Sequence, residues 1–177
     1  MSPFAERKAT LAQDCPRMLH ALPRTGRTGV NVSILSQGGA AIGQQYGPVS
    51  PSEVADCVHA AIDAGVNLVD TRAYYGKGRS EEVLGEILQG GWREKIYLCT
   101  KAGRIDTNEF DFSPAAMERS LDASLSRLKT DYVDILIAHD IEFARDYDAV
   151  FTTRPLASVL PLTHPQQQLC LLGVIVS

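Results

Sequence analysis

The feature that most constrains the fold is a regular alternation of short apolar segments with amphipathic helical segments. We predict strands at 66–70, 95–101 and 132–138, preceded by a strand at 30–35. Between these strands, helical patterns run from Ser50 to Gly65, around Val83 to Leu88, and onward from Ser113. Strands that alternate with helices in this way form parallel sheets joined by right-handed crossovers. The sequence therefore predicts an α/β fold.

The start of the first helix carries a strong local signal. Ser50 and Glu53 match a capping box, in which each side chain bonds to the backbone of the other residue. Pro51 occupies the first helical position, where proline is favoured. We therefore expect a helix that begins at Pro51 with a side-chain cap from Ser50.

Polar side chains stand at the ends of successive predicted strands. Asp70, Lys101 and His139 each close one of the three later strands, and Tyr75 lies in the turn after Asp70. The carboxyl ends of parallel strands meet at one rim of a sheet, and ligands bind at that rim. We therefore expect these four side chains to lie close together.

Each of these residues also has an ordinary structural explanation. Asp70 can cap a turn, Tyr74 and Tyr75 can cover the rim, Lys101 can extend into water, and His139 can be satisfied within the core. An acid, a phenol, an amine and an imidazole are together unusual at the ends of buried strands, so their joint presence favours catalysis. A lysine ammonium lowers the pKa of a nearby phenol from about 10, which suits Tyr75 as a general acid or base. Asp70 would hold Lys101 in place, and His139 would donate a hydrogen bond to a substrate oxygen.

Other motifs in the chain are weaker. Residues 38–43, GGAAIG, follow the first core strand but do not form GxGxxG, so a Rossmann dinucleotide site ranks second. Residues 76–80 precede a helix and could seat an anion, but they do not form a P-loop. The four histidines show no metal-ligand spacing, so we predict no metal site.

Composition excludes several classes of function. With 177 residues, 45% of them hydrophobic, the chain fits one domain with its own core. A net charge of −4 without blocks of like charge gives no reason to expect nucleic acid or an anionic membrane as a partner. The four cysteines form no CxxC motif, and the sequence shows neither a signal peptide nor an apolar run of about 20 residues. We therefore expect reduced cysteines and a cytoplasmic location.

Three segments together resemble the aldo-keto reductase family: GVNLVDTRAYYG at 65–76, Thr100-Lys101, and DYVDILIAH at 131–139. The resemblance runs from about residue 18 to about residue 150. It implies a TIM (β/α)8 barrel that binds NADP or NAD, and an oxidoreductase that transfers a hydride. It places the family's catalytic positions on Asp70, Tyr75, Lys101 and His139, and cofactor contacts on Gly38, Gly39 and Asp70.

Within the family, the chain is most similar to dehydrogenases of L-galactose, D-arabinose and L-fucose. The similarity rests on YGPV at 46–49 and on HDIEF at 139–143. It implies NAD(P)-linked oxidation of a sugar at its anomeric carbon, which gives a lactone. A small-molecule sugar or carbonyl compound is then the expected partner. Ser36-Gln37 departs from the family, which more often has glycine and an aromatic residue there.

The chain is shorter than the family's barrel, which needs about 250 residues. We expect only about the first four β/α units. The predicted parts are a loose leader at 1–17, a barrel half with an N-terminal β-hairpin at 18–150, and a poorly ordered tail at 151–177. A half barrel leaves open sheet edges, which predicts self-association. In the family, the later strands supply much of the grip on the cofactor.

Two further interpretations stay open. The chain can be a catalytically inactive fragment that keeps the four site residues by descent and acts, if at all, by pairing its sheet edge with another barrel. It can also be a flavodoxin-like binding domain. That fold needs a fifth parallel strand after residue 150, but Pro161 interrupts the candidate segment at 156–162.

Overall fold

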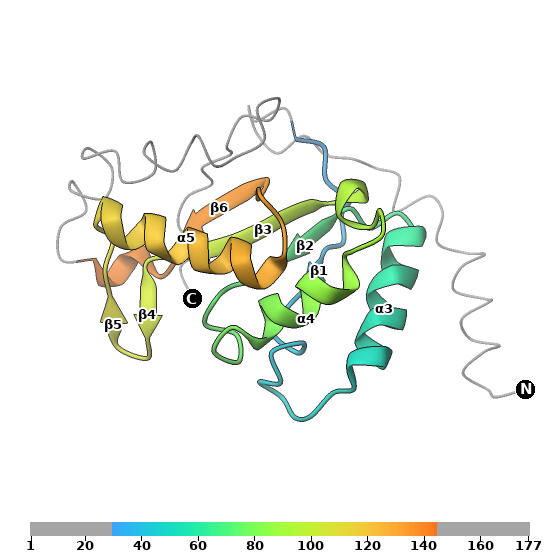
Figure 1. Ribbon diagram of the computed structural model, residues 1–177, viewed down its shortest axis with the longest axis horizontal. Coiled ribbons are helices and arrows are strands. Elements are labelled where there is room, and N and C mark those ends of the chain that lie inside the picture. The colour runs from blue at the N-terminus through green and yellow to red at the C-terminus, as the bar shows by residue number, and fades with distance from the viewer. Residues whose placement is uncertain (1–29, 145–177) are drawn as a thin grey trace, which may run out of the picture.

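The computed structural model describes residues 30–144, which form a four-stranded parallel sheet with its helices packed on one face (Figure 1). The strands are β1 (Gln37–Gly38), β2 (Leu68–Asp70), β3 (Tyr97–Ala102) and β6 (Ile135–Ala138). They lie in the order β1-β2-β3-β6, and each neighbouring pair is parallel. The four carboxyl ends therefore form one rim of the sheet.

Helices connect the strands of this sheet. They are α3 (Pro51–Asp63), α4 (Arg79–Ile87) and α5 (Pro114–Leu128), with 3-10 turns at Arg93–Lys95 and Ile141–Phe143. An antiparallel hairpin of β4 (Arg104–Asp106) and β5 (Glu109–Phe110) lies between β3 and α5 in the chain. None of the helices in residues 30–144 is long and apolar enough to span a membrane. The predicted alternation of strands and helices is confirmed, whereas the sequence pattern does not predict the hairpin.

Three of the predicted strands are present as β2, β3 and β6, although each begins later than its apolar pattern suggests. The delay before β6 has a visible cause in the buried carboxylate of Asp134. This carboxylate accepts hydrogen bonds from the Leu98 N–H and from Arg93 Nη2, each at 2.8 Å. A side chain thus satisfies a backbone donor of β3 at this end of the sheet.

The predicted strand at 30–35 is wrong in position, because the strand in this part of the chain is β1. Both residues of Ile34-Leu35 are 57% exposed, so their side chains do not enter the core. The Ser33 N–H bonds to Asn67 Oδ1 at 2.7 Å, which fixes this segment beside the approach to β2. The earlier arm of the predicted hairpin, the leader and the tail lie outside the described residues.

The two proline-led helices begin where the sequence predicts, but only one has a side-chain cap. The capping box expected at Ser50 is wrong, because its Oγ is hydrogen-bonded to Ser52 Oγ at 2.8 Å and caps no backbone N–H. At the start of α5, Ser113 Oγ accepts a hydrogen bond from the Ala116 N–H at 3.4 Å. Proline at the first helical position therefore marks these starts more reliably than the cap pattern does.

A glycine-rich turn leads from the rim of the sheet into α4. Gly76 and Gly78 have φ angles of +63° and +95°, a left-handed conformation that glycine adopts without steric cost. The turn allows the chain to reverse directly after Tyr75. As a result, α4 begins at Arg79, before the first position of the predicted apolar stripe at Val83.

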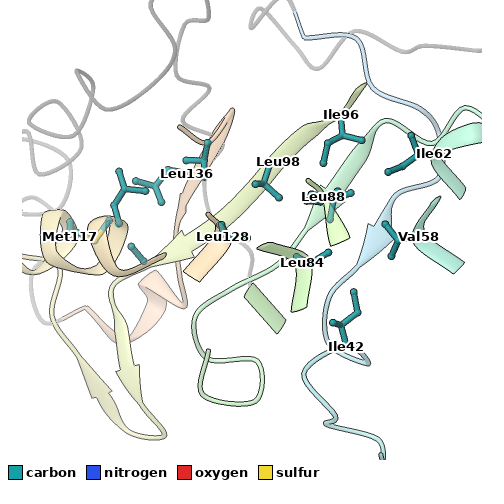
Figure 2. Close-up of a cluster of buried hydrophobic side chains, with 14 of the residues drawn as sticks. Ile42, Val58, Ile62, Leu84, Leu88, Ile96, Leu98, Met117, Leu128 and Leu136 are labelled. Carbon is teal, nitrogen blue, oxygen red and sulfur yellow. The ribbon is translucent and has the colours of Figure 1, made fainter. Parts of the chain in front are cut away.

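The main core lies between the helices and one face of the sheet (Figure 2). Leu98 and Leu136 project into it from neighbouring strands, and both are fully buried. The opposite face carries a smaller apolar cluster, formed by Cys99, Ile135 and Ile137. Because both faces are covered by apolar contacts, the strands read as nearly continuous apolar runs.

The cysteines of the described residues, Cys57 and Cys99, are free thiols. Burial raises the pKa of the Cys99 thiol, and the nearby Asp70 carboxylate raises it further. Cys99 therefore remains protonated and acts as a small apolar side chain at neutral pH.

Candidate active site

The rim of the sheet holds a buried ion pair between neighbouring strands. Lys101 Nζ lies 2.6 Å from Asp70 Oδ1 and 2.7 Å from Oδ2, and it also donates to the Thr71 carbonyl oxygen at 3.2 Å. The Lys101 side chain is 3% exposed, whereas that of Asp70 is 31% exposed. The ammonium is thus held inside the protein, while its carboxylate partner faces the open rim.

His139 stands at the end of β6 and is buried. Its Nε2 accepts a hydrogen bond from Arg72 Nη1, and it lies 3.4 Å from Asp140 Oδ1. Burial and, to a smaller extent, the positive charge of Arg72 lower the pKa of His139 from its ordinary value of 6.5 to about 4, although the Asp140 carboxylate opposes the shift. The imidazole is therefore neutral at pH 7, with its proton on Nδ1.

Tyr75 lies in the turn after β2, and a cation covers its ring. The Arg72 guanidinium is 4.0 Å from the ring centroid, and Lys101 Nζ is 5.8 Å from it. Within the described residues, no hydrogen bond joins Lys101 to the phenol. The structure thus brings Tyr75 near the ion pair without the direct contact between lysine and hydroxyl that the sequence suggests.

A loop from β1 supports this turn through close backbone packing. A Cβ atom on Gly43 would lie 2.7 Å from the carbonyl carbon of Tyr75, and one on Gly76 would lie 2.3 Å from the carbonyl oxygen of Gly43. Any side chain at either glycine would displace the turn. The position of the phenol therefore depends on these two glycines.

The predicted cofactor glycines differ in their surroundings. A Cβ on Gly39 would lie 2.6 Å from Ser80 Oγ, and the Gly39 N–H bonds to the Asp70 carbonyl oxygen at 2.7 Å. Tight packing alone therefore accounts for glycine at this position. A Cβ on Gly38 would meet no atom within 4 Å, so the space beside it is open. Contacts of Gly38, Gly39 and Asp70 with a cofactor stay a prediction.

A buried polar network anchors the start of α4 beneath the rim. Glu81 is fully buried, and its carboxylate accepts from Thr100 Oγ1 at 2.6 Å and from Arg127 Nε at 2.7 Å. Ser80 Oγ contacts Thr71 Oγ1 at 2.9 Å. These bonds tie α4 to the ends of β2 and β3, so the turn that carries the phenol is fixed at both of its ends.

Sequence reasoning missed two arginines at this site, Arg72 and Arg104. Arg72 lies between Asp70 and Tyr75 in the chain, and the strand pattern assigns it no role. Arg104 Nη1 pairs with Asp140 Oδ2 at 2.6 Å, and its guanidinium lies 4.2 Å from the centroid of the Tyr74 ring. Arg104 belongs to the hairpin that the pattern does not predict. An arginine two residues after a strand-end aspartate was the available signal for Arg72.

These features define a class of protein: a parallel β/α fold with a charged site at the carboxyl ends of its strands. The model of the Aldo/keto reductase family matches residues 35–154. The chain belongs to the aldo/keto reductase family, whose fold is the TIM barrel, and the described residues form the first part of that barrel. The resemblance noted in the sequence is confirmed.

Two curated relatives and one solved structure show how much of the chain is similar to known proteins of the family. The chain is 40% identical to L-galactose dehydrogenase of Arabidopsis thaliana over 73% of its own length and 41% of the relative's. It is 34% identical to D-arabinose 1-dehydrogenase of Saccharomyces cerevisiae over 73% of this chain and 39% of that one. A solved structure from Pseudomonas aeruginosa, assigned to the aldo-keto reductases, is 34% identical with a TM-score of 0.69, covering 84% of this chain and 60% of that chain. The chain thus spans about two fifths of the length of these curated relatives.

Proposed function

We propose that the chain carries the proton-transfer half of an NAD(P)-dependent sugar dehydrogenase, which oxidises an aldose to a lactone. The observation that supports this most is the buried ion pair of Lys101 and Asp70 beside Tyr75 at the rim of the sheet. A buried ammonium with a fixed carboxylate partner is the arrangement that stabilises a phenolate during proton transfer. The sugar dehydrogenases among the relatives supply the substrate class of the proposal.

The residues at the rim fit a nicotinamide cofactor. The space beside Gly38 is free of other atoms, and the adjoining Asp70 carboxylate is 31% exposed. Gly38 and Asp70 would flank the nicotinamide, with Gly39 holding the backbone beneath it. The cofactor, NADP or NAD, supplies the acceptor for a hydride from the anomeric carbon.

Each side chain of the site has a role in this reaction. Tyr75 accepts the proton of the sugar hydroxyl as the hydride leaves, and it donates the proton in the reverse direction. Lys101 supports the phenolate through its charge and is oriented by Asp70. His139 is neutral and its Nε2 accepts from Arg72, whose guanidinium lies over the Tyr75 ring, so Arg72 rather than His139 supplies N–H donors on this side of the site.

A second candidate is a catalytically inactive fragment that associates through its sheet edge. The observation that favours it is that the match covers 41% of the plant relative. Self-association and a cytoplasmic location are predictions from the sequence, and neither depends on catalysis.

The first test is binding of NADPH and NADH to the 177-residue chain. Trp92 stacks on His59 at the amino end of β3, away from the rim, so the emission of the reduced nicotinamide is the better reporter. We expect saturable enhancement of that emission. If a folded chain binds neither cofactor, the inactive fragment becomes the better explanation.

The second test is catalytic and uses a matched pair of tyrosines. Tyr75→Phe is expected to lower kcat for aldose oxidation by about 10²- to 10⁴-fold, the contribution of a general acid or base. Cofactor binding should persist, because the ring remains. Tyr74→Phe, which loses only a hydrogen bond to Thr107, is the control. Full activity in Tyr75→Phe would overturn the assignment.

A further inference from the structure

Arg72 occupies the centre of the predicted catalytic residues. It follows β2 by two residues, and its guanidinium lies 4.0 Å from the centroid of the Tyr75 ring and 5.6 Å from that of Tyr74. Its Nη1 donates to Nε2 of His139. One side chain thus contacts both the proposed proton-transfer group and the neutral imidazole. Any sugar placed between those two groups would meet this guanidinium.

The charge of Arg72 has no carboxylate partner in residues 30–144. The two other cations of the site are paired, Lys101 with Asp70 and Arg104 with Asp140. Three cations therefore meet two carboxylates, and the neutral His139 adds no charge at pH 7. One positive charge remains uncompensated at the rim.

The hydrogen-bonding capacity of Arg72 is also largely unused. A guanidinium carries five N–H donors, and the described residues accept a hydrogen bond from Nη1 alone. Its Nε is shielded from solvent and has no acceptor among these residues, so a ligand from solvent does not reach it. The two amino groups carry the remaining N–H donors, and apart from the Nη1 bond to His139 they have no acceptor within residues 30–144, so these donors are left for a ligand.

The chemistry of a guanidinium indicates which ligand group fits. Its planar fork matches the two oxygens of a carboxylate, and the resulting bidentate bonds are charge-assisted. A neutral hydroxyl would fill one acceptor position but leave the charge uncompensated. The site therefore favours an oxyanion, and the flat guanidinium stacked on Tyr75 favours a planar one.

We propose that Arg72 is a substrate-binding residue that selects a sugar carrying a carboxylate group over the corresponding neutral sugar. The inference rests on the proposed function and deepens it by naming the substrate class. The carboxylate would lie against the two amino groups of Arg72, with the reacting hydroxyl directed toward Tyr75. Arg72 then fixes the orientation of the sugar in the site.

The test compares two sugars that differ only at C6, D-glucuronate and D-glucose, without any cofactor. The 177-residue chain is labelled with ¹³C-histidine, and the Cε1–H signal of His139 reports ligands that contact Arg72. We expect saturable shifts with D-glucuronate and at least about tenfold weaker binding of D-glucose, the size of a charge-assisted pair. Equal affinity for the two sugars would overturn the proposal.

Substitutions assign the preference to this residue. Arg72→Met should weaken D-glucuronate binding by about tenfold or more and leave D-glucose binding unchanged. Arg72→Lys keeps the charge but loses the planar guanidinium, so it should retain only part of the preference for D-glucuronate over D-glucose. This variant replaces Arg72→Met in the test if the methionine variant does not fold. Lys77→Met removes a positive charge from the same turn as a control and should change neither affinity. An unchanged preference in both Arg72 variants would contradict the inference.

A third sugar, D-glucose 6-phosphate, tests whether the site prefers a phosphate to a carboxylate. Tighter binding of the phosphate than of D-glucuronate, lost in Arg72→Met, would overturn the carboxylate assignment in favour of a sugar phosphate. Because all these measurements are made without cofactor, they are independent of turnover. Failure of this inference leaves hydride transfer to a neutral sugar intact, whereas full aldose oxidation by Tyr75→Phe would refute the proposed function.

Discussion

Two buried ion pairs lie at opposite ends of the same sheet, and they differ in how far their carboxylate partners are exposed to solvent. At the amino end, Arg93 and Asp134 are 9% and 3% exposed and also bond to backbone groups around them. At the carboxyl end, Lys101 is 3% exposed but Asp70 is 31% exposed. Both partners of the first pair are buried, and the pair ties the start of β3 to the approach to β6. The second leaves one partner facing the rim, where a ligand can reach it.

The largest expected effect is at the buried pair of Arg93 and Asp134. Asp134→Asn removes the charge that balances the buried Arg93 guanidinium and should lower the free energy of unfolding by about 3–5 kcal/mol. Urea denaturation of the 177-residue chain measures this loss. Asp122→Asn, on the exposed face of α5, is the control and should stay within about 0.5 kcal/mol of the parent. A loss below 1 kcal/mol at Asp134, judged against the ~3 kcal/mol expectation, would mean that this pair is not structural.

The next effect concerns pH and lies at the rim. The folded pKa of His139 is about 4, below its ordinary value of 6.5, so the unfolded chain binds more protons between these values. The contribution of His139 to the free energy of unfolding is therefore fully present above pH 6.5. It falls by about 1–3 kcal/mol as the pH drops toward 4.

Carboxylates titrate in part of the same pH range, so the contribution of His139 must be isolated by substitution. His139→Gln should show a flatter decline of unfolding free energy between pH 7 and pH 4 than the parent chain. Parallel curves for the two proteins would show that His139 is not held neutral by the fold.

The smallest effect on stability is expected at the open pair. Asp70→Asn should cost about 1–2 kcal/mol, because the buried Lys101 keeps the Thr71 carbonyl oxygen and an amide oxygen as acceptors. The same variant should lose most of the aldose oxidation that depends on Tyr75. A stability loss as large as that of Asp134→Asn would remove the distinction between the two ends of the sheet.

Chain order explains why part of the site could be predicted from sequence. Asp70, Lys101 and His139 end strands that follow one another in a parallel sheet, so their adjacency follows from the alternation of strands and helices alone. The sequence could not show that Arg72 turns toward His139, because that contact depends on side-chain direction within a turn. The partnership of Arg104 with Asp140 depends on a hairpin of two short strands, which has no strong periodic signal.

The errors at the edges of elements have similar physical causes. Ser50 has the residue type of a cap, but a neighbouring hydroxyl at Ser52 competes for it. Ile34-Leu35 has strand-like composition, yet the hydrogen bond from Ser33 to Asn67 holds that segment before the sheet begins. Local composition predicts which elements exist, while a single side-chain contact decides where each one starts.

Arg104 connects three parts of the rim that are distant in sequence. Its guanidinium bonds to Asp140 after β6, to the Thr107 carbonyl oxygen at the hairpin tip, and lies over Tyr74 in the turn after β2. The side chain therefore links the three segments, and we expect them to open together rather than independently. Slow amide exchange in the hairpin, in the Tyr74 turn and after His139 should then share one opening rate, although no backbone hydrogen bond joins the hairpin to that turn among the described residues.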